Sequence, residues 1–158
     1  MVLDIPASSW RNREYLVSTD LALIQTDKVN QAFASDLMWW AQGLPRETMG
    51  KALGNSLCFG LYEVIGFARL ITDGVTFAWL TDVYVREEYQ GRGLARFMME
   101  AIHDTISEWK YLRRFMLLAS DSMDLYRKTL GVKDWRELGT DDLGVGVLEG
   151  PGGKHPDH

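Results

Sequence analysis

The sequence predicts an α+β fold with a central, mixed but mostly antiparallel sheet of about six to seven strands, flanked by four helices. Residues 57–85 are rich in aromatic and β-branched side chains, and Asp73-Gly74 interrupts them with a strong hairpin signal. Helical periodicity occurs before and after this stretch, and a later strand lies between two helices. Consecutive antiparallel strands followed by helix, strand and helix predict a mixed sheet with helices on its faces.

The length and composition are those of one globular domain. The chain has 158 residues, of which 46% are hydrophobic and 25% charged, enough to bury a single core. We therefore expect one domain over residues 1–150. Residues 151–158 (PGGKHPDH) have too little apolar content to order themselves, and we expect them to form a disordered tail.

Charge, hydropathy and cysteine content argue against several classes of protein. A net charge of −5 and a pI near 5.2 leave no global basic field for holding a phosphate backbone, which argues against nucleic-acid binding. No apolar run approaches the roughly 18 residues that a membrane span requires. Cys58 is the single cysteine, so no intrachain disulfide can form. We expect a cytoplasmic monomer or homodimer that binds neither nucleic acid nor membrane.

The first third of the chain predicts one short strand and two helices. Residues 1–13 show neither the strand period nor the helix period, whereas Tyr15 to Val17 is a short strand-like run. Across residues 26–40 apolar side chains recur at steps of three and four, as in an amphipathic helix. Residues 46–53 predict a second, short helix that ends near a glycine.

Residues 57–85 predict three antiparallel strands. The charged Glu63 separates the first strand from the second, and the Asp73-Gly74 turn separates the second from the third. These strands form the centre of the predicted sheet.

The second half of the chain predicts a strand–helix alternation. Apolar residues at helical spacing run from Leu94 to Trp109 and predict the longest helix. The continuously apolar residues 115–119 predict a strand covered on both faces, and a further helix runs through Leu130. Residues 134–138 and 145–148 are candidates for the last strands.

A glycine-rich turn, residues 90–95 (QGRGLA), joins the third strand of the hairpin region to the longest helix. Free backbone N–H groups and the positive end of a helix dipole can bind a diphosphate there, and Arg92 or Arg96 could add charge. Alternatively, Gly91 and Gly93 only permit a tight turn. The G-x-G-x-x-G dinucleotide fingerprint is not matched, because Arg96 occupies the place of its third glycine.

The turn resembles the pyrophosphate-binding pattern Q/R-x-x-G-x-G/A of the GNAT superfamily of N-acetyltransferases, matched by Gln90, Gly93 and Ala95. The preceding strand TDVYV, the following helix and the later segment DSMDLYRK lie in the family's order, so the resemblance covers roughly residues 17–132. It implies a GNAT-like three-layer fold with acetyl-CoA as cosubstrate and no metal. The implied cofactor-binding residues are Val83, Tyr84, Val85, Gln90, Gly91, Arg92, Gly93, Leu94, Ala95 and Arg96.

Tyr126 matches the tyrosine that many members of this family use as general acid, which would protonate the departing thiolate. The alternative is a packing role with the hydroxyl in solvent. The segment departs from the family pattern, because Tyr126 is followed by Arg127 and Lys128, and Ala119 stands where relatives often have an asparagine.

Asp82 is the best candidate for a general base. It lies inside a strand, where alternation places it on one face with Leu80 and Tyr84, opposite Val83 and Val85. It could take a proton from the acceptor amine, directly or through water. Two alternatives remain open: a structural role at a β-bulge, and electrostatic holding of a cationic substrate.

Trp39, Trp40 and Arg46 lie around the break between the two early helices, a region that in this family often lines the acceptor pocket. Aromatic walls could bind an amine by cation–π contact, although a tryptophan pair at a helix end more often closes the core. His103 is expected on the solvated face of the longest helix. No metal-ligand spacing occurs among the histidines and Cys58.

The resemblance implies an N-acetyltransferase that moves an acetyl group from acetyl-CoA to an amine acceptor by direct attack, with a small-molecule acceptor favoured. Nothing reserves Cys58 as a nucleophile. Two alternatives remain: a protein lysine or N-terminus as acceptor, and a catalytically idle acyl-CoA-binding or interaction domain.

Overall fold

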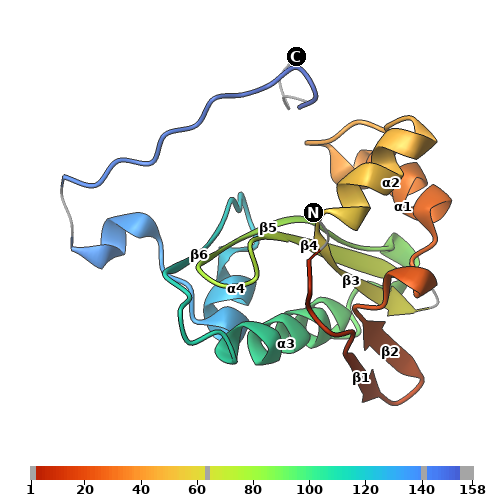
Figure 1. Cartoon of the computed structure of the whole chain (residues 1–158), viewed down its shortest axis with the longest axis horizontal. Coiled ribbons are helices and arrows are strands. Elements are labelled where there is room, and N and C mark those ends of the chain that lie inside the picture. The colour runs from red at the N-terminus through yellow and green to blue at the C-terminus, as the bar shows by residue number, and fades with distance from the viewer. Residues whose placement is uncertain (1–2, 63–64, 140–141, 154–158) are drawn as a thin grey trace.

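The computed structural model describes residues 3–62, 65–139 and 142–153, and its core is one six-stranded sheet in the order β1-β2-β3-β4-β5-β6 (Figure 1). Neighbouring strands are antiparallel except for the parallel pair β5–β6. The strands are β1 (Ser9–Asn12), β2 (Tyr15–Ser18), β3 (Leu57–Tyr62), β4 (Gly66–Thr72), β5 (Phe77–Val85) and β6 (Arg114–Leu117). The predicted α+β fold with a mixed, mostly antiparallel sheet is confirmed.

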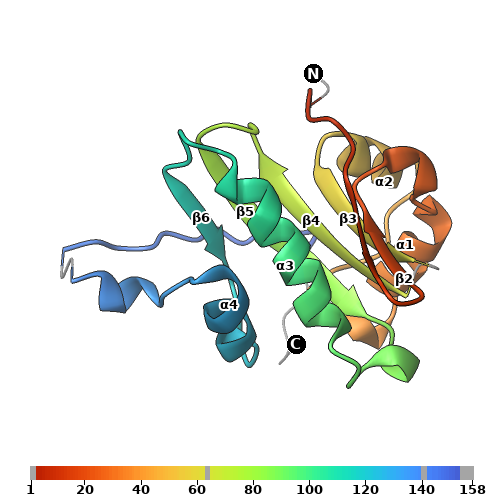
Figure 2. The same cartoon turned by 90° about the horizontal axis from the view of Figure 1, so that it is seen from below.

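Four α-helices among the described residues cover the two faces of the sheet (Figures 1 and 2). α1 (Thr26–Phe33) and α2 (Arg46–Gly54) lie on one face, and α3 (Leu94–Ser107) and α4 (Met123–Leu130) lie on the other. Each face has its own apolar core: Met98 and Ile102 of α3 are fully buried on one side, and Val29 and Met49 on the other. The molecule thus has three layers. No helix within these described stretches has both the length and the apolar character of a membrane span.

The β3–β4–β5 meander forms as the sequence predicts. Asp73 Oδ1 accepts hydrogen bonds from the backbone N–H groups of Val75 and Thr76 at 2.9 and 2.7 Å, and Gly74 has φ +76°. This turn sets the register of the hairpin β4–β5. The predicted break at Glu63 lies outside the described residues.

The N-terminal third differs from the prediction in two places. β1 pairs with β2, although its SWRN sequence shows no alternation, because it is an exposed edge strand that packs only Trp10 against the core. The first helix ends at Phe33 instead of running to residue 40, and the separate 3₁₀ turn Asp36–Met38 follows it. Ser35 starts that turn by accepting a hydrogen bond from the N–H of Leu37.

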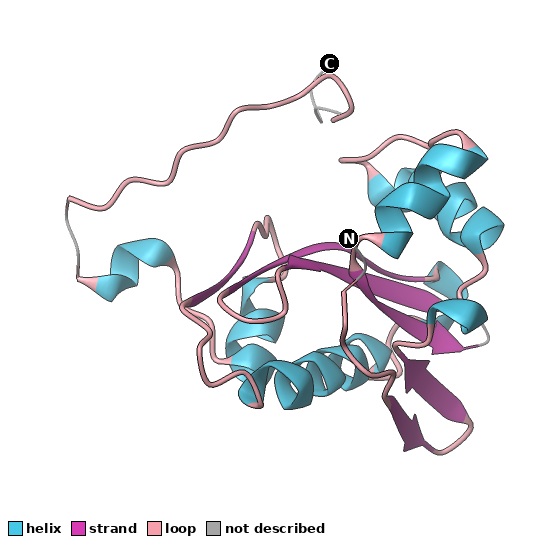
Figure 3. Cartoon of the chain, viewed as in Figure 1, coloured by secondary structure: helices cyan, strands magenta, loops and turns pink. Residues whose placement is uncertain are grey.

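The two predicted C-terminal strands are absent from the described residues (Figure 3). Residues 134–138 instead contain the 3₁₀ helix Trp135–Leu138, because Asp134 caps it by accepting from the N–H of Arg136 at 3.0 Å. Residues 145–148 lie outside any ladder and are exposed, with Leu148 98% exposed. Residues 151–153 of the expected tail form a turn, and residues 154–158 lie outside the described part.

Gly131 fixes the end of α4, the helix that carries Tyr126. It is the C-cap with φ +71°, its N–H donates to the carbonyl of Arg127, and a Cβ would meet nothing within 4 Å. Gly131→Ala therefore adds backbone strain without a steric clash, and we expect it to lower the free energy of unfolding by about 1 kcal/mol.

Urea denaturation measures this change, with Gly144→Ala as control, because Gly144 has open space and no positive φ. Equal stability of the two variants would mean that the left-handed cap contributes nothing.

Candidate active site

Strands β5 and β6 pair over only part of their length. Their parallel ladder runs from Phe77 opposite Arg114 to Leu80 opposite Leu117. Beyond this pair β5 continues to Val85, whereas the chain leaving β6 turns toward α4. The edge of β5 that faces β6 therefore has no neighbouring strand past Leu80 in the described part of the chain, while the other edge stays paired with β4.

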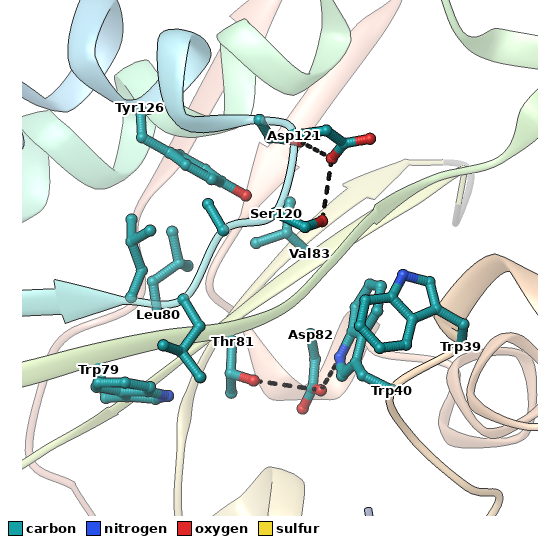
Figure 4. Close-up of a pocket in the computed structure, with 14 residues that line it drawn as sticks. Trp39, Trp40, Trp79, Leu80, Thr81, Asp82, Val83, Ser120, Asp121 and Tyr126 are labelled. Carbon is teal, nitrogen blue, oxygen red and sulfur yellow. Dashed lines mark hydrogen bonds between the residues drawn. The ribbon is translucent and has the colours of Figure 1, made fainter. Parts of the chain in front are cut away.

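A pocket of about 420 Å³ opens where the two strands separate (Figure 4). It brings together segments from three parts of the sequence: the turn after the first helices, the middle of β5, and the segment from β6 into α4. The lining residues are Trp39, Trp40, Trp79, Leu80, Thr81, Asp82, Val83, Leu117, Leu118, Ala119, Ser120, Asp121, Ser122 and Tyr126. The predicted site residues Asp82, Val83, Tyr126, Trp39 and Trp40 therefore share one cavity.

A β-bulge interrupts β5 at the pocket. Asp82 and Val83 together stand opposite Ala68 of β4, so β5 carries one extra residue there. Asp82 has a left-handed backbone with φ +57°, a conformation uncommon outside glycine that aspartate tolerates better than most residues. The bulge places Asp82 at the floor of the gap between β5 and β6 (Figure 4).

The bulge also changes which side chains face each core. Leu80 before it and Val83 and Val85 after it all pack in the core under α3 and α4, whereas Tyr84 packs on the opposite face. The prediction that Asp82 shares a face with Leu80 is therefore wrong. Strict alternation fails because an inserted residue reverses the order of faces.

A buried ion pair holds Asp82. Arg69 donates from Nε (2.9 Å) and Nη2 (2.7 Å) to the same oxygen, Oδ2, and its Nη1 donates to Ser56 Oγ at 3.0 Å. The other oxygen, Oδ1, has only long contacts of 3.4 Å, from Trp40 Nε1 and Thr81 Oγ1. A buried carboxylate needs compensating charge, so Arg69 stabilises Asp82. Because Arg69 bonds only to Oδ2, Oδ1 is the more weakly hydrogen-bonded oxygen.

Tyr126 closes the pocket from the α4 side. Its side chain is 8% exposed, and Figure 4 shows its hydroxyl pointing into the cavity. Burial, with a smaller effect from the negative charge of Asp121, raises the pKa of Tyr126 above its ordinary value of 10.0. The hydroxyl therefore keeps its proton at neutral pH and can act as a proton donor.

The glycine-rich turn lies between the end of β5 and the start of α3. Gly91 (φ +81°) and Gly93 (φ +74°) are left-handed, and a Cβ on either would meet no heavy atom within 4 Å. Gly93 is the N-cap of α3 and provides no side-chain cap, and Gln90 Nε2 ties the turn to the carbonyl of Val85 at 2.9 Å. Open space above a helix N-terminus fits an anion such as a diphosphate.

The two arginines of the turn are engaged with the protein. Arg92 Nη1 donates to the hydroxyl of Tyr15 at 3.0 Å, and its guanidinium lies over the ring of Tyr89 at 5.1 Å. Arg96 pairs with Glu100 at 3.0 Å in an exposed i,i+4 contact. Both remain at the surface beside the turn, where they contribute positive charge.

Three further predicted cofactor residues contribute to packing. Leu94 is buried in the core at the start of α3, and Ala95 is half-buried next to it. Tyr84 is buried on the opposite face of the sheet, where its ring stacks on Phe67 at 6.0 Å. Only the main chain of Tyr84 is therefore available to a ligand in the gap between β5 and β6.

The early aromatic pair reaches the pocket, whereas Arg46 does not line it. Trp39 and Trp40 pack edge to face with ring centroids 5.6 Å apart, and Trp39 is 45% exposed. Arg46, at the start of α2, is exposed and pairs with Asp27 at 3.3 Å.

The structure gives Cys58 and His103 no catalytic place. Burial raises the pKa of the Cys58 thiol to about 12, so it is a protonated core residue. His103 is exposed on α3, as predicted, while His155 and His158 lie outside the described residues. No metal-holding group of three or more His, Cys, Asp or Glu is present among the residues that the structure describes.

Sequence reasoning missed several residues of the site, above all Arg69, and also Trp79 and Ser120. The available signal for Arg69 was a lone charged residue in the otherwise apolar strand GFARLIT, paired in a hairpin with the strand that carries Asp82. A charge inside a covered strand implies an opposite charge nearby.

Comparison with known proteins finds relatives that match most of the chain. Residues 25–132 match the acetyltransferase (GNAT) family. A Gibberella zeae protein whose name assigns it to the acetyltransferases is 43% identical over 169 aligned positions, which cover 93% of this chain and 96% of that protein.

Solved structures agree with this assignment. A structure from Xanthomonas campestris pv. campestris, described as a GNAT-family acetyltransferase, has a TM-score of 0.70 and 32% identity over 85% of this chain and 94% of its own. A protein from meticillin-resistant Staphylococcus aureus has a TM-score of 0.67 and 25% identity over 85% of this chain and 98% of its own. The chain therefore belongs to the GNAT family of acetyltransferases, and it is an acyltransferase.

Proposed function

We propose that this acyltransferase moves an acetyl group from acetyl-CoA to the amine of a small molecule by direct attack of the amine. The observation that carries the proposal is the separation of β5 from β6 after Leu80, which opens a pocket with Tyr126 on one wall and Asp82 on its floor. The glycine-rich turn lies at the end of the same strand, so one elongated cofactor could occupy both places.

Acetyl-CoA fits the residues that the chain provides. The backbone N–H groups at Gly91, Gly93 and the first turn of α3 would hold its diphosphate, since open space lies above both glycines. The free edge of β5 at Val83 and Val85 would hydrogen-bond the pantetheine amides like an added strand. Gln90 fixes the turn against Val85 and so sets the distance between these two parts of the site.

When bound, acetyl-CoA would supply an activated acetyl thioester to the pocket. Tyr126, kept protonated by burial, would donate the proton that the departing thiolate needs. Asp82 would accept the proton of the acceptor amine through Oδ1, directly or by way of water. Arg69 would act as a positioning residue, because it holds Oδ2 and thereby fixes the direction of Oδ1.

The family membership argues against a catalytically idle binding domain. A small acceptor is favoured over a protein because 420 Å³ lies at the low end of ligand pockets. Measuring release of the CoA thiol with a panel of amines and peptides tests the proposal, and turnover with peptides alone would overturn its small-molecule part.

Removing the open space above the turn should abolish cofactor binding. In Gly93→Val the side chain projects into this space, and we expect acetyl-CoA binding to be lost in calorimetry while the protein stays folded. This variant also carries backbone strain, since Gly93 has φ +74°.

Gly139→Val is the matched control, because Gly139 has φ +70°, open space and a position after Trp135–Leu138, outside the site. A folded Gly93→Val protein with unchanged affinity would remove the turn from the cofactor site.

Deleting one hydroxyl tests the proton donor. Tyr126→Phe keeps the ring and its packing, so acetyl-CoA affinity should stay within a few fold while kcat falls by about 10²-fold. Tyr111→Phe, at a 68% exposed position away from the pocket, should leave kcat unchanged. If kcat of Tyr126→Phe stays within about threefold of the parent while chemistry limits the rate, the proton comes from another group.

The raised pKa of Tyr126 predicts the alkaline side of the pH profile. The protonated form of Tyr126 is the active one. Because its pKa is raised above 10.0, Tyr126 can donate a proton at any pH below about 10. As the pH rises from neutral to about 10, we expect no fall in kcat from loss of the Tyr126 proton. Any fall in kcat above a pH of about 10 should be absent from the residual activity of Tyr126→Phe. A parent kcat that declines as the pH rises through neutrality would contradict the assignment of Tyr126 as proton donor.

A further inference from the structure

The pocket offers an incoming acceptor negative charge and no positive charge. Among the described residues that line it, the acidic ones are Asp82 and Asp121, and none is a lysine, arginine or histidine. Arg69, the basic residue next to it, does not line the cavity and uses its guanidinium on Asp82 and Ser56. A carboxylate or phosphate on the acceptor would therefore be desolvated without a partner.

Three indole rings line this pocket. Trp39 and Trp40 come from the turn after α1, and Trp79 comes from β5 (Figure 4). The contact from Trp40 Nε1 to Asp82 Oδ1 at 3.4 Å turns that ring edge toward the carboxylate. Trp39 lines the cavity and is 45% exposed, which leaves a large apolar surface for a ligand to cover.

Asp82 can anchor a cation beside these rings. Its Oδ2 already accepts two hydrogen bonds from Arg69, whereas Oδ1 has only 3.4 Å contacts. An ammonium group could form a charge-assisted bond to Oδ1 at about 2.8 Å, shorter than either existing contact. The same rings attract a cation through their faces.

We propose that the acceptor is an aralkylamine: a primary amine joined to a flat, apolar ring and free of negative charge, with the ring against Trp39, Trp40 and Trp79 and the amine at Asp82. This inference rests on the proposed acetyl transfer in the same pocket. A cavity of about 420 Å³ must also admit the thioester end of the cofactor, so the ring system is small.

A matched pair of amines tests the charge requirement. 2-Phenylethylamine and phenylalanine differ by one carboxylate, and we expect kcat/KM for 2-phenylethylamine to be at least about tenfold higher, because each 1.4 kcal/mol of unfavourable interaction is a factor of ten. Propylamine, which lacks the ring, should have a KM about tenfold above that of 2-phenylethylamine. Equal or better turnover of phenylalanine or of glucosamine 6-phosphate would overturn the proposal.

A tryptophan variant tests the ring contact. Trp39→Ala should raise KM for 2-phenylethylamine about tenfold while kcat and acetyl-CoA affinity stay near the parent values, and Trp39→Phe should recover part of the loss. Trp135→Ala, at a 40% exposed position outside the pocket, is the control. An unchanged KM in folded Trp39→Ala would overturn the role of the rings.

Calorimetry with 2-phenylethylamine separates this inference from the proposed function. Binding that Trp39→Ala weakens, without thiol release from acetyl-CoA, would support the ligand class and refute the acetyl transfer. Thiol release with a lysine-containing peptide and no binding of 2-phenylethylamine would refute the ligand class and leave acetyl transfer in place.

Discussion

The buried ion pair between Arg69 and Asp82 holds β5 at the one point where its alternation breaks. Asp82 stands there in a left-handed conformation that the backbone alone disfavours, and the two hydrogen bonds from Arg69 offset that cost. Before this point β5 pairs with both β4 and β6, and after it β5 pairs with β4 alone among the described strands. The position of the gap, and with it the pocket, depends on where this pair sits.

The pocket combines groups that the rest of the fold keeps apart. Tyr126 belongs to the face covered by α3 and α4, whereas Trp39 and Trp40 follow α1 on the opposite face. A complete sheet would separate these groups by its own thickness. Because β6 pairs with β5 over only four residues, side chains from both layers reach one cavity, so the buried Tyr126 and the exposed Trp39 line the same small volume.

The parts of the fold that sequence predicts well are those with a local cause. The Asp73-Gly74 turn and the 90–95 turn place glycines at left-handed positions that other residues rarely adopt, and α3 shows its period over four turns. β1 carries no pattern, since an edge strand exposed on most sides needs none. The sequence left a bulge at Asp82 as an open alternative and could not decide it, because the ion pair that holds Asp82 comes from Arg69, thirteen residues earlier. Residues 134–138 have a composition that suits a strand, but Asp134 caps a 3₁₀ helix there.

The connections within the sheet differ greatly in length, and this bears on how the molecule opens. β3, β4 and β5 follow one another after short connections, whereas β6 reaches β5 only after the whole of α3 and then pairs over four residues. Local contacts close early in folding, and regions held by few of them open first in the native state. Detachment of β6 and α4 would carry Tyr126 away from Asp82 while the meander stays intact. The proposed proton donor and proposed base are thus brought together by a ladder of only four residue pairs, so we expect activity to be lost at a lower free energy than the fold.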